Sequence, residues 1–267
     1  MSERRGEYGV DGNIVGVVAM SAGGLTLLVL AIVLAWGARL VPAVCAFAGA
    51  ASLLGTIGIY LHTTRRGKFA VWAELVDGLG LSGDERVLDV GCGRGAVLTM
   101  VAKRLPRGRA VGLDLWSGAD QLGNGPAAAR RNLDAEGVRA RCALFTGDMR
   151  SMPFADGSFD LVVSSLAIHN ILDRGGRAQA IDEVARVVRP GGRVVIADLA
   201  WTGSYARGLA ARGLGDVQRR HLGWRFWWGL AFPATRLVHR TQAARFFRVL
   251  TLRLARQRRG RSVGARP

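Results

Sequence analysis

The stretch Val87-Leu88-Asp89-Val90-Gly91-Cys92-Gly93-Arg94-Gly95 decides the fold of this chain. Its first half is short and apolar apart from one acid, as in a buried strand, and its second half carries glycine at alternate positions. Helix-like sequence follows over 96–105. Glycine allows positive φ and close approach of the backbone to a ligand, and a helix N-terminus offers unpaired N–H groups with a partial positive charge. The stretch therefore predicts a strand, a nucleotide-type cofactor loop and a helix.

The loop by itself leaves the cofactor open. Gly91, Gly93 and Ala96 also satisfy the spacing of a dinucleotide-binding fingerprint, so a nicotinamide-dependent oxidoreductase is one alternative. A second strand-like run ends at Asp114, where a carboxylate can accept the hydroxyls of a ribose. A third ends near Asp148, which is a candidate partner for an adenine amino group. A turn or helix-cap role is the alternative for both acids.

Strand and helix patterns alternate around this loop. Strand-like runs are expected at 86–90, 110–115, 141–146, 160–166 and 193–199, and helical patterns at 69–79, 96–105, 126–136 and 176–188. Such alternation predicts an α/β fold with a doubly wound, mostly parallel sheet, whose ligand lies outside the carboxyl ends of the strands.

Five sequence elements occur together in the expected order. They are Leu88–Gly95, Gly112–Asp114, Gly147–Met149 with Met152–Phe154, Phe159–Val162 and Val187–Arg193. From Val87 to Leu199, and more loosely to Thr241, the chain resembles the class I S-adenosylmethionine-dependent methyltransferases. It is most similar to the subgroup that acts on small molecules, including lipid and quinone precursors. The resemblance implies a Rossmann-like fold that ends in a hairpin, 216–222 and 235–240, with the final strand antiparallel.

The resemblance also implies a cofactor site. Asp89 and the backbone of Gly91 and Gly93 would hold the methionine end of S-adenosylmethionine, Asp114 the ribose, and Asp148 with its neighbour the adenine. The remaining expected cofactor-binding residues are Cys92, Gly95, Leu115, Met149 and Ser164. Asp89 discriminates between cofactors, because the methionine amino group is cationic, whereas a carboxylate would repel a pyrophosphate. No metal site is expected.

His169 is the candidate catalytic residue, because it follows the fourth strand-like run at the edge of the expected cleft. A positioned base would help if the methyl acceptor is a hydroxyl or a protonated amine. The alternative is a histidine that is hydrogen-bonded within its loop.

Two uncharged segments precede the domain, at 14–36 and 40–61. At about 1.5 Å per residue, each is long enough to cross the hydrocarbon core of a membrane. A signal peptide and a buried soluble hairpin are the alternatives. Basic residues flank the pair at Arg4, Arg5, Arg65 and Arg66, so the positive-inside rule places both ends in the cytoplasm. The prediction is a multi-pass cell-membrane protein with a cytoplasmic segment at 1–13.

A cytoplasmic methyltransferase domain is expected at 62–243, followed by a tail at 244–267. The formal net charge is +17, and the tail contributes eight arginines and no acids. It is expected to be a basic amphipathic helix on an anionic leaflet, or disordered. Nucleic-acid binding is the less favoured interpretation. Five aromatic residues between 224 and 232 could pack in the core, line a pocket or lie at a bilayer surface.

The predicted function is methyl transfer to a small or lipophilic acceptor at the cytoplasmic membrane face. A membrane sensor that binds S-adenosylmethionine without catalysis is the second hypothesis. The sequence fixes neither the acceptor nor the oligomeric state.

Overall fold

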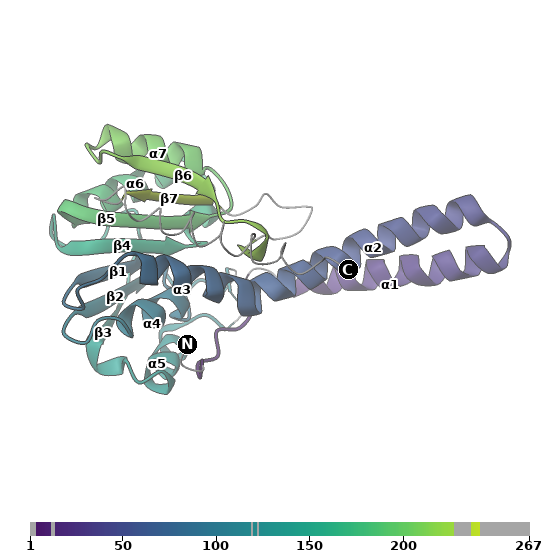
Figure 1. Ribbon diagram of the computed structural model, residues 1–267, viewed down its shortest axis with the longest axis horizontal. Coiled ribbons are helices and arrows are strands. Elements are labelled where there is room, and N and C mark those ends of the chain that lie inside the picture. The colour runs from purple at the N-terminus through teal and green to yellow at the C-terminus, as the bar shows by residue number, and fades with distance from the viewer. Residues whose placement is uncertain (1–3, 12–13, 119, 122, 227–235, 241–267) are drawn as a thin grey trace, which may run out of the picture.

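The computed structural model describes residues 4–11, 14–118, 120–121, 123–226 and 236–240. An α/β domain forms one end of the molecule, and a long helical hairpin projects from one side of it (Figure 1).

A seven-stranded sheet forms the centre of the described part of the domain, with strand order β3-β2-β1-β4-β5-β7-β6. The strands are β1 (Arg86–Val90), β2 (Arg109–Asp114), β3 (Cys142–Thr146), β4 (Phe159–Ser165), β5 (Val188–Asp198), β6 (Val217–His221) and β7 (Arg236–Arg240). Strands β1 to β5 are parallel, and β7 is antiparallel to both of its neighbours. This confirms the predicted fold class, including the antiparallel final strand.

Helices cover both faces of the sheet. The described helices of the domain are α3 (Lys68–Gly78), α4 (Ala96–Ala102), α5 (Pro126–Ala135), α6 (Arg174–Val187) and α7 (Thr202–Ala211), with short 3-10 turns at Arg139–Arg141, Ile168–Asn170 and Trp224–Phe226. One core cluster packs α3 and α4 against Val87, and a second packs α6 and α7 against Leu88. Successive side chains of β1 therefore point into the two core clusters on opposite faces of the sheet, as the two-residue period of a strand requires.

One strand boundary differs from the sequence expectations, and one open question about the aromatic residues is answered. Strand β5 begins at Val188 and not at 193, because Phe159 pairs with Val188 before the register shifts and Leu161 pairs with Arg193. Among the aromatic residues of 224–232, Phe226 is fully buried in the core beside α3, which agrees with the core-packing interpretation. Residues 227–235 and the basic tail lie outside the described residues.

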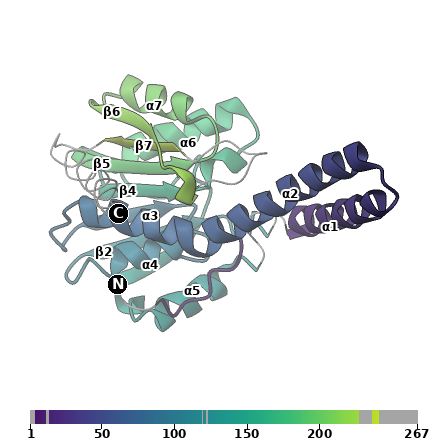
Figure 2. The ribbon, with the colours of Figure 1, turned by 45° about the vertical axis from the view of Figure 1, so that its right-hand side comes forward.

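The hairpin consists of α1 (Ile14–Trp36) and α2 (Leu40–His62). Both helices are long and apolar enough to cross a membrane, and their large side chains are mainly exposed, as at Val41. The second helix does not end at 61, because a π-helical turn (Thr63–Gly67) continues it directly into α3 (Figure 2). Glycine is required at position 67 of this turn, because a Cβ there would overlap the carbonyl oxygen of Arg225.

Residues 4–11 form an N-terminal strap that packs on α4 and α5 (Figure 2). The main chain of Glu7 exchanges two hydrogen bonds with the side chain of Asn132, at 2.8 and 3.0 Å. The buried Tyr8 hydroxyl lies 2.9 Å from Thr99 Oγ1 and donates to Glu136 at 3.2 Å. The strap and the continuous α2–α3 helix therefore attach the hairpin to the domain on both sides.

Candidate active site

The glycine loop turns sharply between β1 and α4. Gly91, Gly93 and Gly95 all have positive φ, at 71°, 51° and 82°. A Cβ on Gly91 would overlap that of Ala167, so both the backbone conformation and the available space require glycine there. The loop is fixed to the next strand by a 2.8 Å hydrogen bond from the Gly91 amide to the Leu113 carbonyl.

Asp89 lies at the base of this loop and is 1% exposed. Neither carboxylate oxygen has a hydrogen bond of ordinary geometry among the described residues. Burial, together with the nearby charge of Asp114, raises the pKa of Asp89 to about 8. A buried carboxylate with no donor is costly, so Asp89 is a site that a cationic ligand group would satisfy.

Asp114, at the end of β2, braces the loop from the other side. It accepts hydrogen bonds from the Gly93 amide at 2.7 Å, the Trp116 amide at 2.6 Å and the Asn124 side chain at 3.2 Å. An ionised carboxylate has about four lone-pair sites, so one remains for a ligand hydroxyl without rearrangement.

The structure brings most of the predicted cofactor residues around a single cavity of about 810 Å³. From the predicted set it is lined by Asp89, Gly91, Cys92, Gly93, Asp114, Leu115, Asp148, Met149 and His169. Two predicted residues do not line it. Gly95 caps α4, and Ser164 is buried with its hydroxyl donating to the Val90 carbonyl at 2.8 Å.

The surroundings of Asp148 and Cys92 determine the protonation state of each side chain. The Asp148 carboxylate is paired with the Arg150 guanidinium at 2.6–3.0 Å, which lowers its pKa. Burial, with the charges of Asp89 and Asp114, raises the pKa of the Cys92 thiol. Cys92 is therefore a thiol at neutral pH and a poor nucleophile.

His169 is fixed by an acid that sequence analysis did not identify. Its Nδ1 lies 2.5 Å from Asp198 Oδ1, and its amide donates to Asp198 Oδ2 at 3.1 Å. Burial lowers the pKa of His169, but the hydrogen bond to Asp198 and the charges of Asp198 and Asp120 outweigh it and raise the pKa overall. Because Nδ1 is engaged with Asp198, Nε2 is the ring nitrogen available to accept a proton.

A signal for Asp198 was present in the sequence. Asp89, Asp114 and Asp198 are all acids at or next to the end of an apolar strand. The parallel pairing of β4 with β5 brings Asp198 next to the turn that carries His169.

The cofactor end of the cavity fits S-adenosylmethionine. The methionine amino group of this cofactor is a cation that the buried Asp89 carboxylate can accept. A dinucleotide pyrophosphate would place negative charge next to Asp89 and Asp114.

A parallel sheet with this glycine loop, and with acids at or next to the carboxyl ends of β1, β2 and β5, is the arrangement of a class I methyltransferase fold. A family described as "Methyltransferase domain" matches residues 87–192. The chain therefore carries a class I S-adenosylmethionine-dependent methyltransferase domain.

Similar proteins agree with this assignment. The chain is 34% identical over 135 residues to the "Ubiquinone/menaquinone biosynthesis C-methyltransferase UbiE" of Dinoroseobacter shibae, which is 50% of each chain. It is 32% identical over 134 residues to a chloroplastic "2-phytyl-1,4-beta-naphthoquinone methyltransferase" of Arabidopsis thaliana, 49% of each. The chain thus spans about half the length of these relatives. A solved methyltransferase from Aquifex aeolicus shares the fold, with a TM-score of 0.50 and 16% identity over 63% of this chain and 88% of that one.

Proposed function

We propose that this protein transfers the methyl group of S-adenosylmethionine to a lipophilic acceptor of the quinone-precursor type at the cytoplasmic face of the cell membrane. The observation that carries the proposal is Asp89, a buried carboxyl group beside a glycine loop whose oxygens have no hydrogen bond of ordinary geometry to the described part of the chain.

The residues around the cavity have distinct tasks. When bound, S-adenosylmethionine supplies an electrophilic methyl group on a cationic sulfur, so the protein mainly aligns the reacting atoms. Asp89 and the Gly91 and Gly93 backbone hold the methionine end. Asp114 accepts a hydrogen bond from one ribose hydroxyl, and Asp148 with Met149 holds the adenine.

His169 accepts the proton that the acceptor loses. Bound S-adenosylmethionine would supply the methyl carbon for the new bond, and its sulfur would keep the electron pair of the carbon–sulfur bond. The acceptor must then release a proton, and His169 Nε2 is the available base, with Asp198 stabilising the resulting imidazolium.

The acceptor class is supported by the relatives, whose printed names describe methyl transfer in quinone synthesis. A quinone ring carbon is electrophilic, whereas the same carbon in the reduced quinol is nucleophilic. We therefore expect the quinol form to be the acceptor.

The membrane location is supported by the hairpin. Its apolar side chains are exposed over both helices, which a soluble protein rarely tolerates on this scale. The arginines at both ends favour a cytoplasmic domain.

Calorimetry of S-adenosylmethionine binding tests the site. Because the pKa of free Asp89 is about 8, binding below pH 8 should release a proton, and affinity should rise with pH from 6 to 8. Asp89→Asn should weaken binding by about 10- to 100-fold, the equivalent of a charge-assisted hydrogen bond, and should remove this pH dependence. Wild-type affinity in Asp89→Asn would exclude the assigned role.

Formation of S-adenosylhomocysteine with dithionite-reduced 2-phytyl-1,4-naphthoquinone tests the reaction. Turnover supports the proposal. Binding without turnover on this quinol or on a membrane lipid extract would favour the sensor.

A further inference from the structure

The cavity extends beyond the cofactor site to the base of the hairpin. Its lining includes Gly16, Val17 and Met20 from α1 and Thr56, Ile57 and Tyr60 from α2. These residues lie at the end of the hairpin that joins the domain (Figure 1). The same cavity thus contacts the glycine loop at one end and two candidate membrane-spanning helices at the other.

The two ends of the cavity differ in polarity. Acids lie at the cofactor end, namely Asp89, Asp114 and Asp148. At the hairpin end, Val17, Met20 and Ile57 provide an apolar wall. His169, Trp72 and Leu166 lie on the part of the wall that the domain provides.

The two charged residues that line the hairpin end of the cavity, Lys68 and Asp11, are paired with each other. Lys68 is buried and forms an ion pair with Asp11 of the strap, which also accepts from Gln121 at 2.9 Å and from the Thr64 hydroxyl at 3.1 Å. The Tyr60 hydroxyl donates to the Asp11 carbonyl. Among the described residues that line this end of the cavity, no charge is left for an ionic tail, so this end suits an uncharged, apolar chain.

We propose that the base of the hairpin is the binding site for the apolar chain of the methyl acceptor. The chain lies along Val17, Met20 and Ile57, and the reacting head reaches His169. The acceptor enters from the hydrocarbon phase and does not leave the bilayer completely. This inference rests on the proposed function, and it assigns the hairpin a role in substrate binding besides anchoring.

Photolabelling of the full chain in nanodiscs tests the site without requiring turnover. The probe is an uncharged sixteen-carbon alcohol that carries a diazirine in its chain. In the wild type we expect labelled peptides that contain Trp72 or Leu166, which a chain confined to the bilayer outside the cavity cannot reach.

Two substitutions fill the apolar end, Met20→Trp and Ile57→Trp. Each should reduce labelling of the Trp72 and Leu166 peptides at least tenfold. The matched controls are Val29→Trp on α1 and Val44→Trp on α2, whose side chains are exposed and do not line the cavity. They should retain wild-type labelling. Retained S-adenosylmethionine affinity in all four variants shows that the domain is folded.

Kinetics provide the second measurement. The ratio of kcat/KM for reduced 2-phytyl-1,4-naphthoquinone to that for reduced 1,4-naphthoquinone should fall at least tenfold in the two filling variants only. Absence of domain labelling in the wild type, or equal labelling in filled and control variants, would overturn the chain site. Labelling as expected with neither quinol methylated would instead overturn the quinone acceptor and leave the chain site standing.

Discussion

Buried Asp89 and partly buried His169 are both titratable groups in the cavity, but their surroundings differ. Asp89 has no hydrogen bond of ordinary geometry among the described residues, and burial, with the nearby charge of Asp114, raises its pKa. His169 has the Asp198 carboxylate at 2.5 Å, and its pKa is raised because its charged form is stabilised. The first group needs a cation from a ligand, whereas the second is already oriented for proton transfer.

His169 gives a prediction for the pH dependence of kcat/KM. Only neutral His169 can accept a proton, so kcat/KM should rise with pH through the His169 pKa and reach a plateau above it. Asp198→Asn removes the main interaction that raises this pKa, so the rising limb should move to lower pH. The plateau should also fall, because the ring loses its orienting acceptor. His169→Ala should lose about 100-fold or more on the plateau, and its profile should lack the limb that belongs to His169.

Asp120→Asn is the matched control for this experiment. Asp120 raises the His169 pKa by charge alone, so its removal should shift the limb to lower pH with little loss of ring orientation. A pH profile that is identical in wild type and Asp198→Asn would refute the positioning role, and unchanged turnover in His169→Ala would remove the base.

At the scale of elements, local features were predictable and contacts between distant segments were not. The β1–loop–α4 unit follows from adjacent residues, because an apolar strand, three glycines and a helical pattern each act locally. Asp198 was missed because only the β4–β5 pairing brings it to His169. The strap was missed because Tyr8 is buried by α4 and α5, and no periodicity in a segment this short indicates such a contact.

The strap can be tested through Tyr8. In Tyr8→Phe the hydroxyl that contacts Thr99 and Glu136 is lost, which should cost about 1–2 kcal/mol of unfolding free energy. Amide hydrogen exchange in residues 4–11 should accelerate. Glu7→Ala is the control, because Glu7 is exposed and its hydrogen bonds to Asn132 use the main chain. If both variants exchange alike, the hydroxyl does not hold the strap.

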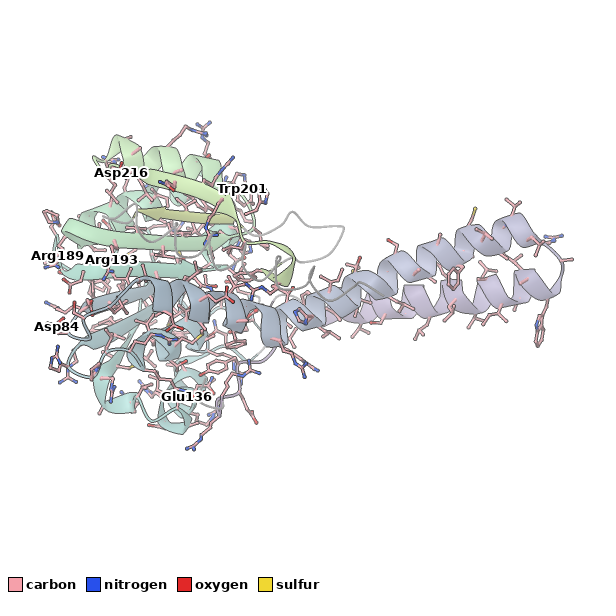
Figure 3. All side chains as sticks on the ribbon, in the orientation of Figure 1. Asp84, Glu136, Arg189, Arg193, Trp201 and Asp216 are labelled. Carbon is pink, nitrogen blue, oxygen red and sulfur yellow. The ribbon has the colours of Figure 1, made fainter. Side chains whose placement is uncertain are left out.

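At the scale of the whole molecule, the hairpin lies on one particular side of the domain. Figure 3 places Asp84, Arg189 and Arg193 on the side of the domain away from the hairpin, and Trp201 on the side toward it. Because Arg189 and Trp201 lie near the start and just past the end of β5, the carboxyl ends of the parallel strands face the hairpin. The sequence predicted an anchor and a cleft separately, but not that the cleft opens toward the anchor.

This arrangement predicts a fixed orientation on the bilayer. Leu172, at the rim of the cavity, is 91% exposed, and Asp84 lies at the opposite end of the domain. On a Cys45→Ser background, whose other cysteines are buried, nitroxides at Leu172→Cys and Asp84→Cys report the two ends. In nanodiscs with nickel-chelating lipid, the label at 172 should relax much faster than the label at 84, since paramagnetic relaxation falls steeply with distance.

The π-helical turn explains why the orientation should be fixed, because α2 reaches α3 without a flexible linker. Inserting two glycines between Arg65 and Arg66 breaks this helix, and the difference between the two labels should then shrink. If the labels at 172 and 84 relax at similar rates in the chain without the insertion, the hairpin does not hold the domain against the bilayer. The opening of the cavity would then not stay at the membrane surface. An acceptor dissolved in the bilayer would have to cross water to reach His169.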